Sequence, residues 1–160
     1  MNRIGDSLWS TGDNKPLVQA FIDAGVEFVV VGGLAVSWYC SERQADDMDV
    51  LLNPTPKNSI RVVRVLQEQR INDLEEMAFA RQNVQMPLKK WHYAELLTPR
   101  TDGESYTDVS KKAVQGKLFD FPVLIAAKDT IIGMKCFADG TSDSLLEKHR
   151  QDLKALRALV

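Results

Sequence analysis

The sequence predicts an α/β domain in which buried strands alternate with helices, and three neighbouring features indicate this class. Residues 28–31 (Phe-Val-Val-Val) form an apolar, β-branched run that is typical of a fully buried strand. Gly32 and Gly33 end this run, and residues 34–40 are long enough for about two helical turns. Residues 47–52 (Asp-Met-Asp-Val-Leu-Leu) then return to strand character and carry two acids.

The composition is that of one ordinary globular domain. The chain has 160 residues, of which 44% are hydrophobic, and its formal net charge is −2, so it is long enough to enclose a real core. This mild acidity argues against a general nucleic-acid binder, which usually carries a basic surplus, but it leaves a local basic patch open. The sequence contains no apolar run of membrane-spanning length, no signal-peptide pattern and no CxxC pair among its two cysteines. We therefore expect a cytoplasmic protein without membrane contact.

The acids of the third segment are the first candidate functional residues. Residues i and i+2 of a strand point to the same face, so Asp47 and Asp49 are expected to point together, with Cα atoms about 6.5 Å apart. Like charges this close cost free energy unless a cation or a shared proton relieves them. Carboxylate ligands without nearby Cys or His favour magnesium or manganese over zinc. A solvated strand edge is the alternative for the acids, but the neighbouring Gly-Gly turn favours a site for metal and phosphate.

Taken together, residues 31–36 (Val-Gly-Gly-Leu-Ala-Val), Arg43 and residues 47–50 (Asp-Met-Asp-Val) resemble the signature of the DNA polymerase β-type nucleotidyltransferase superfamily. The resemblance is closest to its small bacterial members, the abortive-infection and toxin-type (minimal) nucleotidyltransferases. It implies a small mixed β-sheet with helices packed against it. The sequence departs from the family pattern at Ala45, where the family often has Thr.

The resemblance also implies roles for residues outside the acid pair. In the family a third acid, usually Asp, lies on a later strand, and the pattern of apolar residue, acid, Leu-Leu-Thr makes Glu95 the candidate. The alternative for Glu95 is an exposed acid on an edge strand. The family's glycine turn approaches a triphosphate, as Gly32 and Gly33 would here, and Lys135 matches a lysine that contacts the triphosphate. Arg43 is either a phosphate contact or half of a surface salt bridge.

The remaining elements are predicted from local patterns. We expect the following elements: a loose arm over residues 1–12; a helix from residues 13–16 that stops at Gly25; helices over residues 57–70 and 71–80; a hairpin of residues 84–88 with 92–97 around Lys89 and Lys90; a short helix over residues 105–113; a strand over residues 117–125; a helix from residue 127; and a last helix from Ser144. Residues 148–153 partly resemble the family's Arg-x-x-Asp-Leu segment, so Arg150 and Asp152 are structural or phosphate-side candidates.

These predictions combine into one function and one alternative. The function is a nucleotidyltransferase, dependent on Mg²⁺ or Mn²⁺, that moves a nucleoside monophosphate from ATP or another nucleoside triphosphate to a hydroxyl of a small molecule, transfer RNA or protein. Asp47, Asp49 and Glu95 hold the metal, and Glu95 deprotonates the acceptor or completes the metal site. The alternative is a catalytically inactive binding module of the same fold, such as a toxin–antitoxin or phage-defence component, which Ala45 and Glu95 favour. Dimerisation, or an antitoxin-like partner, would supply a missing wall of the cleft.

Overall fold

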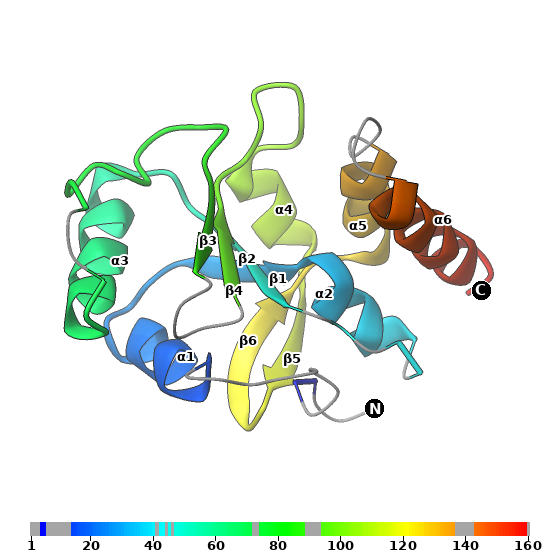
Figure 1. Ribbon diagram of the computed structural model, residues 1–160, viewed down its shortest axis with the longest axis horizontal. Helices are drawn as coiled ribbons and strands as arrows, with labels where there is room; N and C mark the ends of the chain where they lie inside the picture. Colours follow the sequence, from blue (N-terminus) through cyan, green and yellow to red (C-terminus); the bar gives the residue numbers. More distant parts are fainter. Residues whose placement is uncertain are drawn as a thin grey trace.

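The computed structural model describes residues 4–5, 14–40, 42–43, 45, 47–71, 74–88, 94–136 and 143–159, and this part of the chain forms a six-stranded mixed sheet and six helices (Figure 1). The elements run in the order α1 (Asn14–Asp23), β1 (Phe28–Val31), α2 (Gly32–Tyr39), β2 (Met48–Leu52), α3 (Pro56–Glu68), β3 (Gln85–Leu88), β4 (Ala94–Leu97), α4 (Tyr106–Lys112), β5 (Val114–Leu118), β6 (Phe121–Ile125), α5 (Lys128–Cys136) and α6 (Asp143–Arg157). The predicted class, a small mixed sheet with helices packed against it, is confirmed.

The two strands predicted around the glycine turn lie at the centre of the sheet. The strand order is β3-β4-β2-β1-β6-β5. β1 is antiparallel to β2 and parallel to β6, β2 is parallel to β4, and the outer strands β3 and β5 are antiparallel to their neighbours. All four residues of β1 are buried, as the continuous apolar run predicts.

β2 shows why the acids are exceptional in a core strand. Successive side chains of a strand point to opposite faces of the sheet. Met48, Val50 and Leu52 share one face and are fully buried. Asp49 lies on the other face and is only partly buried. The sheet therefore has one closed face at this position and one on which a carboxylate keeps contact with solvent.

Two pairs of helices lie at opposite ends of the molecule. α1 contacts α3, and α2 contacts both α5 and α6. Figure 1 shows α1 and α3 at one end of the molecule, and α5 beside α6 at the other. α2 and α5 directly follow the parallel neighbours β1 and β6, so both helices begin near the same edge of the sheet.

The predicted stop of the first helix at Gly25 is confirmed. Gly25 has φ 71°, and its N–H donates to the carbonyl oxygen of Ile22 at 3.1 Å. The N–H of Val26 donates to the carbonyl oxygen of Phe21 at 2.9 Å. This pair of bonds closes the last turn of α1 as a Schellman motif and sends the chain directly into β1.

The prediction of a short helix over residues 71–80 is wrong in the part that the structure describes. Residues 76–79 form hydrogen-bonded turns instead. The hydroxyl of Ser59 on α3 donates to the carbonyl oxygen of Glu76 at 2.6 Å and accepts from the N–H of Phe79 at 2.9 Å. Phe79 is fully buried. The anchoring of Phe79 and the bonds to Ser59 replace the hydrogen bonds that a helix would need.

The single strand predicted over residues 117–125 is two strands. β5 and β6 form an antiparallel hairpin that turns at Phe119 and Asp120. Phe119 has φ 56° and is buried, and its N–H donates to the carbonyl oxygen of Ile4 at 2.6 Å. Burial of Phe119 and its pairing with Ile4 stabilise this turn, although Phe119 is not a residue that is typical of turns. Of the predicted loose arm, only Ile4 and Gly5 are described, and both are buried.

The other predicted elements are present with shifted ends. The hairpin is β3 with β4, while its predicted turn at Lys89 and Lys90 lies outside the described residues. The helices expected over 57–70 and 105–113 and from residues 127 and 144 correspond to α3, α4, α5 and α6. None of the helices in the described part of the chain is long and apolar enough to cross a membrane.

Candidate active site

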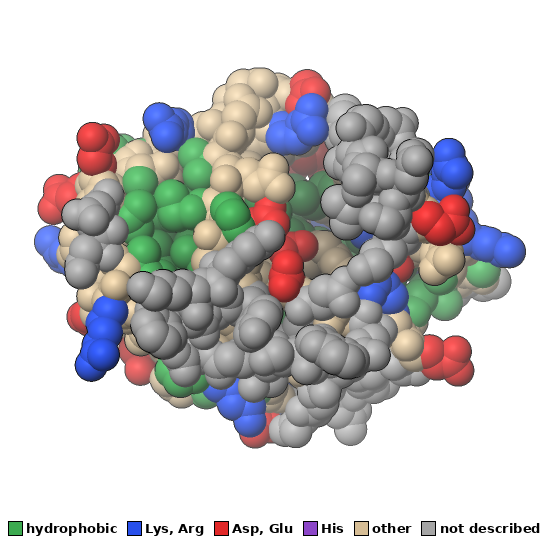
Figure 2. All heavy atoms as spheres, in the orientation of Figure 1, with side chains coloured by type: hydrophobic (Ala, Val, Ile, Leu, Met, Phe, Trp, Pro, Cys, Tyr) green, Lys and Arg blue, Asp and Glu red, His purple; other side chains and the backbone are tan. Residues whose placement is uncertain are grey.

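The backbone places Asp49 next to Glu95. Asp49 on β2 is the register partner of Glu95 on β4 and of Val31 on β1. Neighbouring strands lie about 4.8 Å apart, and paired residues point to the same face, so the two carboxylates rise side by side. Figure 2 shows acidic side chains gathered near the middle of one face of the molecule, in the region where Figure 1 labels β1 and β2.

Asp47 approaches this pair differently from the prediction. It lies in a bend one residue before β2 begins, so the two-residue strand period does not set its direction. Its carboxylate nevertheless acts on Asp49, because its negative charge raises the pKa of that group. Asp46, the acid between Asp47 and the buried Ala45, lies outside the described residues.

The glycine turn lies against the Asp49 carboxylate. Gly32 has φ 69°, a left-handed conformation that side chains disfavour. A Cβ atom at Gly32 would lie 2.2 Å from Oδ2 of Asp49, which is closer than any real contact. Gly32 is also the first residue of α2, where backbone N–H groups have no partner within the helix. The turn therefore places the Asp49 carboxylate next to the backbone of Gly32 and next to the N–H groups at the start of α2.

The surroundings favour the neutral form of Asp49. Burial, followed by the neighbouring charges of Glu95 and Asp47, raises the pKa of Asp49 to about 7, while Lys135 opposes the rise. Such a group is partly protonated near neutral pH. A bound cation would relieve both the burial cost and the repulsion between carboxylates.

Glu95 has a hydrogen-bond partner that the sequence analysis missed. Nε2 of Gln85 on β3 donates to Oε1 of Glu95. The register pairs Pro87 with Glu95 and Gln85 with Leu97, so Gln85 reaches Glu95 diagonally on the same face. A turn centred on Lys89 and Lys90 would instead have placed Val84 opposite Glu95. The register could not be predicted from the sequence, and so neither could this contact.

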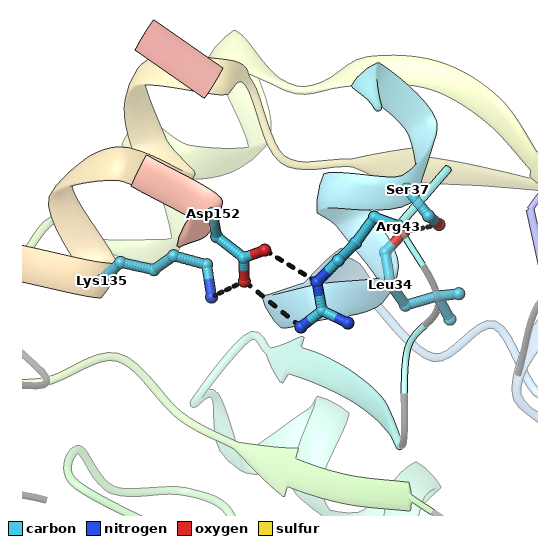
Figure 3. Close-up of polar contacts among 5 residues, drawn as sticks. All are labelled: Leu34, Ser37, Arg43, Lys135 and Asp152. Atoms are coloured by element: carbon cyan, nitrogen blue, oxygen red, sulfur yellow. Dashed lines mark hydrogen bonds and ion pairs between the residues drawn. The ribbon is translucent and has the colours of Figure 1, made fainter. Parts of the chain in front are cut away.

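Three charged side chains, those of Arg43, Lys135 and Asp152, form a cluster (Figure 3). Oδ1 of Asp152 on α6 accepts from Nε of Arg43 at 2.7 Å, and Oδ2 accepts from Nζ of Lys135 on α5 at 2.9 Å. The side chains of Lys135 and Asp152 are only 7% and 4% exposed. Lys135 is therefore not an exposed helix lysine, and Arg43 pairs with a buried carboxylate instead of a surface one. The other candidate of this segment, Arg150, is exposed.

Arg43 also touches the glycine turn. A Cβ atom at Gly33 would lie 2.9 Å from Nη2 of Arg43, so the guanidinium lies against the main chain at the start of α2. Both cationic side chains thus stand at the edge of the acid site, Arg43 at the glycine turn and Lys135 within electrostatic reach of Asp49. The pKa of Asp152 itself is lowered by Arg43 and Lys135, against the opposing effect of burial.

The acidic residues fit a hard divalent cation in chemistry. Within the described residues, no three side chains of His, Cys, Asp or Glu are grouped closely enough to hold a metal ion. The register nevertheless places two carboxylates side by side, and the raised pKa of Asp49 shows that the anionic form lacks compensation. Oxygen ligands of this kind suit Mg²⁺ or Mn²⁺. Asp49 and Glu95 are the residues placed to hold the ion together, and Asp47 would have to move closer to them to become a third ligand.

Comparison with known proteins identifies the fold. No family model and no curated protein matches the chain. A structure of ANT(2")-Ia in complex with adenylyl-2"-tobramycin is similar with a TM-score of 0.56 and 12% sequence identity, covering 89% of this chain and 84% of that one. An antigenic nucleotidyltransferase-like protein from Paracoccidioides brasiliensis is similar with a TM-score of 0.52 and 10% identity, covering 91% and 77%. The chain therefore has the nucleotidyltransferase fold that residues 31–50 predicted.

Proposed function

We propose that this protein is a metal-dependent nucleotidyltransferase, which transfers a nucleoside monophosphate from a nucleoside triphosphate to a hydroxyl group and releases pyrophosphate. The observation that carries the proposal is the in-register pair of Asp49 and Glu95 beside the left-handed Gly32. The fold supports it, because both similar structures are nucleotidyltransferases or resemble them.

The acids would hold the metal. Asp47, Asp49 and Glu95 are the ligands of Mg²⁺ or Mn²⁺ in this proposal, and Gly32 leaves room for the Asp49 carboxylate, because a Cβ at this position would lie 2.2 Å from its Oδ2. An ion held by these acids would supply positive charge that neutralises the phosphates and favours in-line attack at the α-phosphorus.

The basic side would hold the triphosphate. Backbone N–H groups at Gly32, Gly33 and the first turn of α2 are suited to phosphate oxygens, because they have no partners within the helix. Arg43 stands against Gly33 and Lys135 stands near Asp49, so their charges flank the same place. Both would bind phosphate oxygens.

Glu95 is the proposed base for the acceptor. The hydroxyl oxygen of the acceptor forms a bond to the α-phosphorus, the bond from that phosphorus to the bridging oxygen breaks, and pyrophosphate leaves with the electron pair. The proton of the hydroxyl passes to the carboxylate of Glu95. Gln85 supports this role by donating a hydrogen bond to one carboxylate oxygen, which leaves the other oxygen for the proton.

The nature of the donor and of the acceptor is a separate part of the proposal. ATP is the first donor to test, because the similar ANT(2")-Ia structure holds an adenylylated product. The acceptor is a hydroxyl-bearing small molecule, transfer RNA or protein. The motif at residues 31–50 favours the small abortive-infection and toxin-type members, and we expect the protein to act in the cytoplasm.

Thermal unfolding with ligands tests the proposal. A ligand at about 100 times its dissociation constant adds about 2.7 kcal/mol to the stability of the native state. We expect Mg²⁺ with one of ATP, CTP, GTP or UTP to raise the Tm of the wild-type protein by several degrees. Omission of the metal or the Asp47→Asn/Asp49→Asn double substitution should abolish this increase.

A matched control removes the same charge elsewhere. The Asp23→Asn/Asp129→Asn double substitution changes two exposed acids outside the site and should keep the full increase in Tm. Absence of any increase with all four triphosphates at millimolar concentration would reject the transferase and favour a binding module without catalysis. An increase that survives in the Asp47→Asn/Asp49→Asn protein would also reject it.

A further inference from the structure

A single buried carboxylate joins three parts of the chain beside the proposed nucleotide site. Asp152 on α6 accepts from Arg43, which precedes β2, and from Lys135 on α5. Arg43 and Asp152 are 109 positions apart in sequence. Figure 3 shows the two cationic side chains approaching the carboxylate from different sides. α6 therefore contributes to this region although none of its residues belongs to the proposed acid site.

The two cations that Asp152 binds come from different elements. The guanidinium of Arg43 lies against Gly33, at the start of α2. The ammonium of Lys135 comes from α5, which packs against α2, and it donates to Oδ2 of Asp152 at 2.9 Å. Asp152 thus holds both cations beside the helix that begins at the glycine turn.

Burial makes this arrangement specific. Lys and Arg side chains have many rotamers, and fixing one costs about 2 kcal/mol of conformational entropy. Asp152 offsets this cost with three charge-assisted bonds, two from Arg43 and one from Lys135, in a place where its side chain is only 4% exposed. One carboxylate with two cations leaves one net positive charge in the cluster.

We infer that Asp152 is a positioning residue of the nucleotide site, whose carboxylate holds Lys135 and Arg43 where the phosphates of a triphosphate at the Gly32–Gly33 turn would meet them. This inference rests on the proposed function. It assigns to α6 a role in nucleotide binding without contact between Asp152 and the nucleotide.

The inference predicts that loss of the Asp152 charge weakens triphosphate binding, whereas the electrostatic field alone would predict stronger binding. Removing a negative charge near an anion-binding site should strengthen anion binding if only the electrostatic field matters. If Asp152 positions the two cations, the Asp152→Asn substitution should instead weaken binding of Mg²⁺ with the preferred triphosphate by about tenfold or more, since Lys135 and Arg43 lose the charged bonds that orient them. Inorganic tripolyphosphate, which lacks base and ribose, should lose affinity by a similar factor.

Titration calorimetry at a temperature well below the unfolding transition of each variant tests this prediction. The control is Asp129→Asn, which removes the same charge from an exposed position on α5 and should bind as tightly as the wild type or slightly more tightly. A double-mutant cycle adds a readout that general destabilisation would not move. In the Lys135→Met background, Asp152→Asn should weaken binding less than in the wild type, because one of the two cations that it positions is already absent.

The outcomes separate this inference from the proposed function. If the wild-type protein binds no triphosphate, the proposed function fails, and the inference fails with it. If the wild type binds and Asp152→Asn binds equally or more tightly, the proposed function stands and the positioning role is rejected. Should Asp152→Asn not fold, Asp152→Glu decides, because it keeps the charge but moves the carboxylate: unchanged affinity for the triphosphate would reject the inference, and a loss of about tenfold would support it.

Discussion

At position 32, the backbone conformation and the neighbouring Asp49 carboxylate both favour glycine. Its φ of 69° is costly for any residue with a side chain, and the space where a Cβ would lie is taken by Oδ2 of Asp49. The two constraints are independent, because one concerns the backbone and the other concerns a neighbouring strand. Both constraints require glycine at position 32, and this glycine leaves room for the Asp49 carboxylate against the start of α2.

We expect Gly32→Ala to destabilise the protein by about 2 kcal/mol or more, from the left-handed backbone and the displaced carboxylate. Chemical denaturation measures this loss. The control is Gly133→Ala in α5, where a Cβ meets no atom within 4 Å, and this change should stabilise the protein by about 0.5 to 1 kcal/mol. A neutral Gly32→Ala would show that Asp49 does not depend on the glycine.

The triphosphate-induced increase in Tm should be affected as well. In Gly32→Ala the added methyl group pushes Asp49 away from its place, so stabilisation by Mg²⁺ with a triphosphate should fall, whereas Gly133→Ala should keep it. Full retention in Gly32→Ala would contradict the proposed contact between the glycine turn and the phosphates.

At the scale of elements, the edge strand β3 supports the site through Gln85. Gln85 donates a hydrogen bond to Glu95, which would act mainly on the acceptor and only partly on the donor. We therefore expect Gln85→Met to lower kcat about tenfold and to change the donor KM by less than threefold. Pyrophosphate release measures both constants. Gln115→Met on β5, an exposed glutamine on the opposite edge strand, should change neither. An equal loss in donor binding would assign Gln85 to the nucleotide instead.

The contact between α3 and the turns at residues 76–79 is a second test at this scale. Ser59→Ala leaves the N–H of Phe79 and the carbonyl of Glu76 without their partner, and we expect a loss of about 2 kcal/mol in unfolding free energy. Ser110→Ala removes an exposed helical hydroxyl and should change stability by less than about 0.5 kcal/mol. A Ser59→Ala protein as stable as the wild type would mean that the helix propensity of alanine compensates for both bonds.

The sequence predicted the elements whose signals are local. The apolar run of β1, the helix expected over residues 57–70 and the stop at Gly25 depend on neighbours within a few residues, and each is found in the structure. The turn at Phe119 was missed because an aromatic residue is not expected at positive φ, and only burial and pairing with Ile4 explain it.

The sequence predicted the candidate site only where its residues lie close together in the chain. Gly32, Gly33, Arg43 and Asp49 lie within one stretch of the sequence, and the structure places Asp49 against Gly32 and Arg43 against Gly33. The pairing of Asp49 with Glu95 depends on the order of strands in the sheet, which local patterns do not contain, and it was expected from the family resemblance alone. The partners Gln85 and Asp152 depend on a strand register and on helix packing, so no sequence signal identified their contacts.

At the scale of the whole molecule, the carboxyl groups of Asp152 and Asp49 affect the pH dependence of stability in opposite directions. Asp152 is held ionised by Arg43 and Lys135, so its pKa is lower in the folded protein than in the unfolded one. Its contribution to stability is present above the unfolded pKa of about 3.8 and is lost as the pH falls below that range. Asp49 is the reverse case, because burial and its acidic neighbours raise its folded pKa to about 7. Its contribution is complete below pH 3.8 and is lost as the pH rises through 7.

The metal-free protein should therefore be most stable in weakly acidic solution. Between pH 5 and pH 8 the ionisation of Asp49 should lower the unfolding free energy by on the order of 2 kcal/mol, which corresponds to several degrees in Tm. The Asp49→Asn protein has no group to ionise at this position, so its Tm should change little over the same range and should exceed that of the wild type at pH 8. Thermal unfolding in metal-free buffers from pH 4 to pH 8.5 measures both profiles.

Magnesium should reverse this preference in the wild type. A cation binds the ionised form of Asp49, so added Mg²⁺ should raise the Tm more at pH 8 than at pH 5.5, and it should have no pH-dependent effect on Asp49→Asn. Parallel profiles for the two proteins without metal would show that Asp49 is already ionised at neutral pH. The repulsion among Asp47, Asp49 and Glu95 would then be too weak to favour a metal, and the argument that these three acids form a cation site would lose its electrostatic support.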